Sequence, residues 1–386
     1  MARTVYLHVG VPKSGTSYLQ STLWAHRDQL REHGVLLPGS GRHDHAWSTF
    51  TVREDPALAK RPRMALRAWD RVLADTAAWP GTAVISHEFF GAADAEQAAR
   101  ALAALAPAEV HLVVTARDAL SLLTASWQET LKYRNVETLD EFNRKISTDP
   151  LDVWNWRSLD AGEVLARWAR DLPPERVHVV PVPRDPASRS ELWRRFAGLF
   201  VDDPAVLDDS GGHRNESMGL VESELLRRVS SRLTVSTDDL STKTWVRDYL
   251  GIEKLVPRRG ERFLPGADRV AECRERSAEM VARLREAGYH VVGDLADLEV
   301  PDELPDRRTP ADVTDTELAE AAASLIADLL VDHQRSTAAL KESERRRRRL
   351  RKRLRQQQAT PRPRPSYVKW LIAAFTRHGA RLGPRE

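Results

Sequence analysis

Cysteine is almost absent from this sequence: Cys273 is the single cysteine among 386 residues. No disulfide can therefore form within the chain, which agrees with a reducing compartment. No apolar run reaches the roughly 20 residues that a membrane-spanning helix needs. The first residues show no basic segment followed by an apolar run and a cleavage site, so no signal peptide is expected. These absences favour a cytoplasmic protein.

Net positive charge is missing from the chain outside one end. The formal net charge is +3, but residues 341–386 contain 16 Lys or Arg and only 3 Asp or Glu, a net charge of +13. The remaining residues therefore carry a net charge of −10. Because the body of the protein is acidic, any anion-binding site within it must be built from a few local groups.

Four short runs rich in β-branched residues alternate with stretches of helix-forming residues. The runs are Thr4–Gly10, Thr82–Glu88, Val110–Asp118 and Arg176–Arg184. This alternation predicts an α/β protein with three layers, in which helices flank a central parallel sheet as in P-loop NTPases. Their nearly continuous apolar character indicates strands buried on both faces. From about Ser190 onward the pattern becomes mostly helical, which predicts a helical C-terminal extension.

Changes in composition divide the chain into three parts. Residues 1–300 are predicted to form the α/β domain, and residues 301–340 a connector followed by an amphipathic helix. Residues 341–386 form a basic tail with a proline-rich linker and a terminal amphipathic segment.

The first predicted strand runs directly into a glycine-containing loop and a helix, with the sequence VGVPKSGTSYLQ from Val9 to Gln20. Such a turn collects backbone N–H groups at a helix N-terminus, where the helix dipole also favours an anion. The Walker A loop places its lysine directly after the second glycine, whereas Lys13 precedes Gly15 here. No residue obviously takes the Mg²⁺-binding role. The loop therefore predicts a phosphate site of another kind, the alternative being an ordinary turn with a surface lysine.

The segment PKSGTSYLQ resembles the 5′-phosphosulfate loop of sulfotransferases that depend on PAPS (3′-phosphoadenosine 5′-phosphosulfate). The resemblance covers residues 1–300 and implies that PAPS is the donor substrate and that no metal is needed. It also implies that Lys13 contacts the phosphosulfate and stabilises the bridging oxygen as it leaves. The residues implied to hold the phosphate oxygens are Ser14, Gly15, Thr16 and Ser17.

The same family carries an arginine at the end of a later strand and a serine about two helical turns further on, and these bind the 3′-phosphate. Arg117 ends the predicted strand Val110–Asp118 and matches the arginine. The usual serine position holds Ala125, so we expect Ser126, or otherwise Thr124, to supply the hydroxyl. The alternative for Arg117 is a structural ion pair with a carboxylate.

Two arginine-containing loops further along the chain are weaker candidates for closing over a nucleotide. One is the segment His213–Gly219, in which Arg214 is the candidate, and the other contains Arg258, Arg259 and Gly260. An arginine fork suits phosphate, but surface loops rich in arginine are also common without any such role.

Transfer to a hydroxyl also needs a group that takes the acceptor's proton, usually a histidine or a glutamate. Glu88, at the end of the predicted strand Thr82–Glu88, is the first candidate for this base, followed by His87 and then His45. The alternative for Glu88 is a helix cap or an ion pair with Arg117. His43 and His45 could begin a metal site, but no further His or Cys cluster has ligand spacing, so no metal is expected.

Three functions remain open at this stage. The first is a PAPS-dependent sulfotransferase acting on a hydroxyl of a small molecule or glycan: a carbohydrate, lipid or secondary metabolite. The second is a nucleotide-dependent kinase with a variant P-loop. The third is a non-catalytic anion-binding adaptor that works through its basic tail.

The basic tail has its own alternatives. Its arginine-rich stretch is followed by Val368, Leu371, Ile372 and Phe375 at helical spacing. This combination is typical of peripheral contact with an anionic membrane, here the inner membrane surface. The alternatives are that the tail docks on a partner protein or that it is a disordered arm. Nucleic acid is not an expected partner.

Overall fold

A computed structural model describes residues 2–144, 147, 149, 151–185, 189–207, 217–234 and 241–359. Its internal contacts separate two compact units, Met1–Ala321 and Ala322–Glu386. All candidate site residues lie in the first unit.

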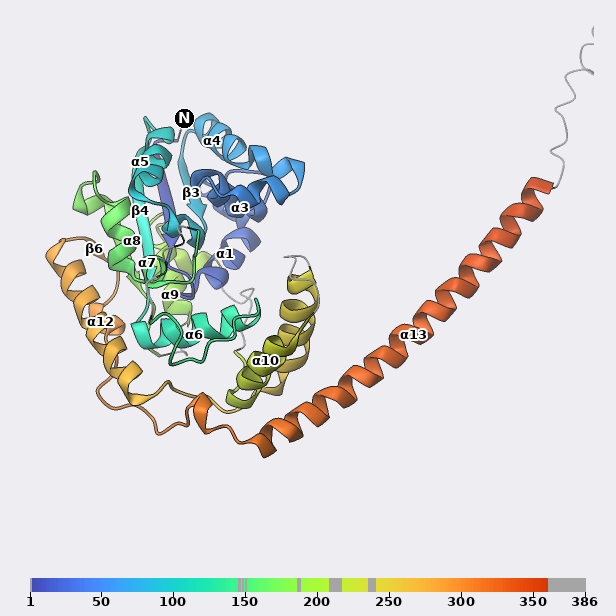
Figure 1. Cartoon of the computed structure of the whole chain (residues 1–386). Coiled ribbons are helices and arrows are strands. Elements are labelled where there is room, and N and C mark those ends of the chain that lie inside the picture. Colours follow the sequence, from blue (N-terminus) through green and yellow to red (C-terminus); the bar gives the residue numbers. More distant parts are fainter. Residues whose placement is uncertain are drawn as a thin grey trace, which may run out of the picture. The chain divides into compact units, whose positions relative to one another are not determined.

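The first unit contains a six-stranded parallel sheet with the strand order β2-β3-β1-β4-β5-β6 (Figure 1). The strands are β1 (Thr4–Gly10), β2 (Val35–Leu36), β3 (Thr82–Ser86), β4 (Glu109–Ala116), β5 (Val177–Pro181) and β6 (His290–Val291). The chain first builds the sheet on one side of β1, through β2 and β3, and then crosses to β4 on its other side. Ligands of open α/β sheets bind at such a reversal point, at the carboxyl ends of the strands.

Helices flank the sheet on both sides (Figure 1). The longer ones of the first unit are α1 (Thr16–Ala25), α2 (Arg27–Glu32), α3 (Arg42–Val52), α4 (Ala68–Ala78), α5 (Ala95–Ala104), α6 (Ala119–Leu131), α8 (Ala161–Trp168), α9 (Arg189–Ala197), α10 (Leu220–Arg232) and α12 (Ala267–Glu286). Short 3-10 turns, the one-turn helix α7 (Trp156–Leu159) and a π-helix, η7 (Thr242–Leu255), connect them. The fold class predicted from the sequence is confirmed.

Two hydrophobic clusters lie on opposite faces of the sheet. Along β1, Leu7 and Val9 pack in one cluster with α8 and α12, including Trp168 and Met280. The other cluster joins side chains of β3, β4 and β5 to α1 and α9, including Leu19 and Trp193. Because both faces are covered, the strands read as nearly continuous apolar runs.

The strand predictions differ from the structure mainly at the ends. The range Thr4–Gly10 matches β1, whereas Thr82–Glu88 is too long, because β3 ends at Ser86 and a 3-10 helix, η3 (Glu88–Ala92), begins at Glu88. The edge strands β2 and β6 were not predicted. Each contains only two residues, too few for an alternating pattern to be recognised.

The helix α13 (Asp315–Ala359) has 45 residues and continues through the arginine-rich stretch. The basic residues from Lys341 to Arg355 are therefore helical. No helix among the described residues is long and apolar enough to cross a membrane. The proline-rich linker and the terminal segment lie outside the described residues, so membrane contact and the three-part division stay predictions.

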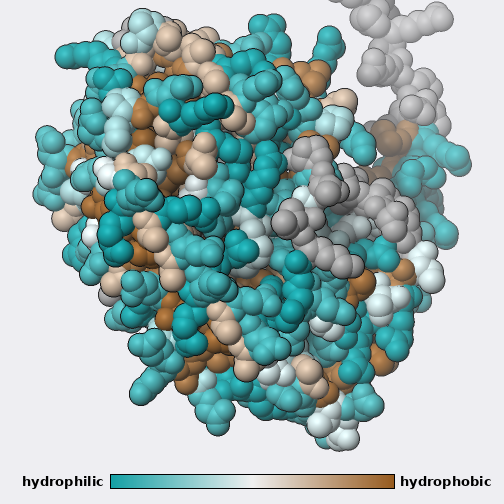
Figure 2. All heavy atoms as spheres, turned by 60° about the vertical axis from the view of Figure 1, so that its left-hand side comes forward, coloured by the Kyte–Doolittle hydropathy of each residue, from teal (hydrophilic) through white to brown (hydrophobic). Residues whose placement is uncertain are grey.

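Figure 2 shows one face of the molecule, and hydrophilic residues cover most of it. Hydrophobic residues are scattered over this face singly or in small groups, as on an ordinary protein surface.

Candidate functional site

The loop between β1 and α1 is held in a bent conformation. Gly15 has a φ of 85° and caps the N-terminus of α1, and a β-carbon there would lie 2.5 Å from Leu192 Cδ2. Lys13 also has a positive φ, of 63°, which is costly for a residue with a side chain. The Val11 N–H donates to the Thr115 carbonyl at 2.9 Å, so β4 fixes the loop. The surrounding structure thus enforces an unfavourable backbone at the predicted phosphate loop.

Backbone donors at the start of α1 are unused. Within the described part of the chain, the N–H groups of Gly15, Thr16 and Ser17 donate no hydrogen bond to a backbone carbonyl. The Ser14 hydroxyl is buried instead, 2.6 Å from Thr115 Oγ1, and holds the loop on β4. Three free N–H groups at a helix N-terminus are the arrangement that binds phosphate or sulfate.

Arg117 lies directly beside this loop. Its Nη1 donates to the Lys13 carbonyl oxygen at 3.3 Å, and burial lowers the pKa of its guanidinium. The neighbouring carboxylate, Asp118, is occupied as the N-cap of α6. No carboxylate among the described residues forms an ion pair with Arg117, in contrast to the structural alternative considered from the sequence. The positive charge of Arg117 is therefore left for another anion.

The Lys13 side chain points to helix α6. Its Nζ lies 3.2 Å from Glu129 Oε2, and both side chains are largely buried. Sequence reasoning missed Glu129. One signal could have found it, since Glu129 is the single charged residue in the helix that follows Arg117.

The two hydroxyl candidates on α6 differ in their surroundings. The Thr124 hydroxyl donates to the Leu120 carbonyl within the helix, at 3.0 Å. Ser126 is fully buried, and its hydroxyl has no hydrogen-bond partner among the described residues. Ser126 is three residues before Glu129 and therefore shares its side of the helix. Its role at a 3′-phosphate stays a prediction.

Glu88 lies against the beginning of the loop. A β-carbon on Gly10 would lie 3.0 Å from the Glu88 carbonyl oxygen, and Gln20 of α1 donates to Glu88 Oε2 at 2.8 Å. Burial opposes ionisation of Glu88, but His87 and Gln20 together bring the pKa of its carboxyl below its usual value. Glu88 is thus an ionised acceptor beside the loop, and its partner is Gln20 and not Arg117.

His87 caps the 3-10 helix η3. Its Nδ1 accepts from the Phe89 N–H at 3.2 Å and lies 3.9 Å from Glu88 Oε2. Burial lowers the pKa of His87, and the neighbouring Glu88 carboxylate opposes this shift. His87 and Glu88 thus directly follow β3, whereas the sequence predicted them as its last two residues.

His45, the third candidate base, is buried in α3. Its Nε2 donates to the Pro38 carbonyl at 2.9 Å, and its Nδ1 accepts from the Ser86 N–H at 3.2 Å. Both ring nitrogens are therefore occupied by the backbone, and burial lowers the pKa of His45 to about 4. A catalytic role for His45 stays a prediction, but the contacts describe a histidine that joins α3 to the end of β3.

Buried neutral histidines predict a loss of stability in acid. Burial lowers the pKa of His8, as of His45, to about 4, below the value of 6.5 expected in the unfolded chain. The unfolded state binds protons more readily. The contribution of these histidines to the free energy of unfolding is therefore complete above pH 6.5 and is lost as the pH falls towards 4. We expect each histidine to contribute up to about 3 kcal/mol to this loss.

Urea unfolding between pH 4 and pH 7.5 measures this effect. The variant His8→Asn should flatten the pH dependence, and the exposed control His33→Gln should leave it as in the wild type. An unchanged slope in His8→Asn would show that His8 titrates normally in the folded protein.

The candidate Arg214 and residues up to 216 lie outside the described residues. The end of that segment does meet the second arginine loop: Leu220 N–H donates to the Glu261 carbonyl at 2.8 Å, and Gly219 packs on Gly260. Two segments singled out separately in the sequence are therefore neighbours.

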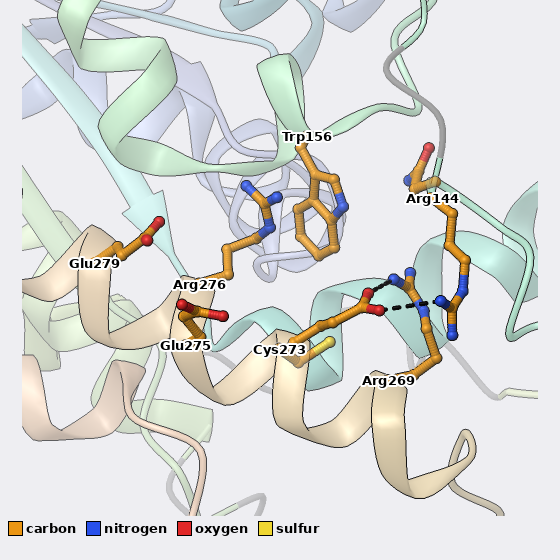
Figure 3. Close-up of a pocket in the computed structure, with 9 residues that line it drawn as sticks. Arg144, Trp156, Arg269, Cys273, Glu275, Arg276 and Glu279 are labelled. Atoms are coloured by element: carbon orange, nitrogen blue, oxygen red, sulfur yellow. Dashed lines mark hydrogen bonds and ion pairs between the residues drawn. The ribbon is translucent and has the colours of Figure 1, made fainter.

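A separate cavity of about 340 Å³ lies along helix α12 (Figure 3). Arg276 lies over the ring of Trp156 at 4.5 Å, and Arg144 pairs with Glu272 at 3.1 Å. Arg269 forms a second ion pair with Glu272. No residue of the loop from Gly10 to Ser17 lines it. Trp156 lines this cavity.

Within the described ranges, no group of three or more His, Cys, Asp or Glu side chains is arranged to hold a metal ion.

Comparisons with known proteins give little beyond this geometry. No family model and no curated protein matches the chain. Among solved structures, the sulfotransferase domain from the curacin biosynthetic pathway is similar with a TM-score of 0.35 and 12% identity, over 75% of this chain and 99% of that chain. A likeness of this extent carries no conclusion about activity, which must come from the site itself.

Proposed function

We propose that this protein is a sulfotransferase that transfers the sulfuryl group of PAPS to a hydroxyl of a carbohydrate, lipid or secondary metabolite. One observation carries the proposal. Arg117, without a carboxylate partner among the described residues, contacts the backbone of Lys13 at 3.3 Å, at the reversal point of the sheet.

The residues present fit a donor with an anionic group at each end. Lys13 and the free N–H groups of Gly15, Thr16 and Ser17 would hold the 5′-phosphosulfate. Arg117 and the unpartnered hydroxyl of Ser126 would hold the 3′-phosphate. The Ser126 hydroxyl has no hydrogen-bond partner among the described residues, so it would be free to donate to a phosphate oxygen.

The donor supplies a sulfuryl group already attached to a phosphate leaving group. Lys13 would stabilise the negative charge that develops on the phosphate oxygen as its bond to sulfur breaks. Glu88 would accept the proton of the acceptor hydroxyl while the oxygen of that hydroxyl forms its bond to sulfur. Positioning and charge stabilisation carry most of the rate in such transfers, so a lysine and a carboxylate suffice for these roles.

Replacement of Glu88 by glutamine tests the base. We expect kcat to fall by about 10²- to 10⁴-fold, because an amide cannot accept the proton. The affinity for PAP (3′-phosphoadenosine 5′-phosphate, the desulfated product) should be unchanged, because Gln20 can still bond to the amide oxygen. Turnover like that of the wild type would remove Glu88 from this role.

Thermal shift with PAP, ATP·Mg²⁺ and sulfate separates the three functions. Stabilisation by PAP supports the sulfotransferase. A preference for ATP·Mg²⁺ would support the variant kinase, and no response to either nucleotide would favour the adaptor. A screen of cell extract with labelled PAPS would then identify the acceptor.

A further inference from the structure

Three cations converge on Glu129, a residue without a part in the chemistry above. Lys132 Nζ lies 3.0 Å from Glu129 Oε2, on the same oxygen as Lys13 at 3.2 Å, and Arg247 Nε lies 3.6 Å from Oε1. The glutamate side chain is only 12% exposed. Burial opposes ionisation, but Lys13, Lys132 and Arg247 bring the pKa of Glu129 to about 2. Glu129 is therefore a permanent anion at neutral pH.

Glu129 and a bound donor would compete for Lys13. A lysine ammonium is a compact charge on a flexible stem, and it moves between anions within its reach. The Glu129 carboxylate already contacts Lys13 Nζ, which is the group expected to bind the phosphosulfate. The ammonium must leave Glu129, at least in part, when it takes up the donor.

The other two cations, Lys132 and Arg247, lower the free-energy cost of this exchange. Breaking a buried ion pair is costly mainly because it leaves one charge without a partner. Glu129 would retain Lys132 and Arg247 after Lys13 departs. Lys132 is held in place, because its stem packs on Gly251, where a β-carbon would lie 3.2 Å from Lys132 Cγ. The carboxylate therefore stays satisfied both with and without a ligand on Lys13.

We propose that Glu129 is a positioning residue, which holds Lys13 against helix α6 in the free protein and releases it when a phosphosulfate or phosphate binds the loop. Lys132 and Arg247 keep Glu129 in place during the exchange. The inference rests on the proposed donor site. It goes beyond that site because it identifies Glu129 as a group of the protein that competes with the donor for Lys13. Only ligands with an anion at the 5′ position then displace Glu129 from Lys13.

The variant Glu129→Gln tests this role through two ligands. PAP carries both phosphates, whereas 3′-AMP keeps the 3′-phosphate for Arg117 and lacks the 5′-phosphate. We expect Glu129→Gln to bind PAP about tenfold more tightly, as the loss of one partly buried competing ion pair predicts. Its affinity for 3′-AMP should equal that of the wild type. Isothermal titration calorimetry measures both constants.

Two further variants keep the result interpretable. The double variant Glu129→Gln/Lys132→Met also removes the charge of Lys132, which has no partner once Glu129 is replaced. The methionine side chain can still pack on Gly251. This double variant is used if Glu129→Gln alone fails to fold. In a Lys13→Ala background, Glu129→Gln should no longer change PAP affinity. The exposed control Glu96→Gln should change neither constant.

Several outcomes would overturn the role of Glu129. These are weaker PAP binding, equal changes for PAP and 3′-AMP, or a gain that persists without Lys13. They differ from a failure of the proposed function, in which the wild-type protein itself would not bind PAP.

Discussion

Replacement of Lys13 by alanine is expected to lower the rate of sulfuryl transfer from PAPS by up to about 10³-fold. The side chain extends from the loop that also offers the N–H groups of Gly15, Thr16 and Ser17. Its charge would act most strongly on the oxygen that becomes negative as the bond to sulfur breaks. The loss should therefore appear mainly in kcat, and binding of PAP should weaken less, because the backbone donors and Arg117 remain.

Steady-state kinetics with PAPS and titration with PAP measure these two effects separately. The control is Lys60→Ala, which removes an exposed lysine at the end of the 3-10 helix Pro56–Lys60. The variant Lys13→Arg keeps the charge but changes its geometry, so we expect it to recover binding more than rate. A Lys13→Ala protein with at least a tenth of the wild-type kcat would contradict a role for Lys13 at the leaving oxygen.

The sequence was sufficient to predict the central features of the fold for a physical reason. Strands β1 and β4 are buried on both faces, so their apolar runs are continuous and easily recognised. In parallel sheets the residues that follow neighbouring strands meet at one edge. Lys13 and Arg117 could therefore be expected together, and the structure brings them into contact.

Other features depend on contacts that the sequence does not reveal. Glu129 approaches Lys13 across 116 positions of the chain, and Arg247 reaches the same carboxylate from the π-helix Thr242–Leu255. Gln20 is a polar residue in an ordinary helix until Glu88 is placed beside it. Long-range polar contacts of this kind leave no periodic pattern in the sequence, because each contact depends on a single side chain.

The cationic site lies within a part of the chain that is acidic overall. Residues 1–340 carry a net charge of −10, yet Lys13, Arg117, Lys132 and Arg247 are gathered at one end of the β1 and β4 strands and the adjoining helices. Among the described residues, Glu129 and Asp248 form ion pairs with members of this group, and Glu88 lies against the loop. A positive site in an acidic surrounding favours anionic ligands over a short range only.

Replacement of Arg117 by alanine should abolish the preference for a 3′-phosphate. A charged hydrogen-bonded pair in a partly buried site is worth several kcal/mol, so we expect PAP to bind about 100-fold more weakly. Binding of 5′-AMP, which lacks the 3′-phosphate, should change much less, because Lys13 and the N–H groups of the loop would hold its phosphate. The ratio of the two affinities thus reports on Arg117 directly.

Calorimetric titration of both nucleotides provides this ratio, and Arg100→Ala on the exposed side of α5 is the matched control. The variant Arg117→Lys should recover part of the preference, since it keeps the charge and loses the fork. Equal weakening of PAP and 5′-AMP would instead mean that Arg117 acts by supporting the loop through the Lys13 carbonyl. Ser126→Ala distinguishes the two cases further, because only a 3′-phosphate bound between Arg117 and Ser126 makes PAP, and not 5′-AMP, sensitive to loss of that hydroxyl.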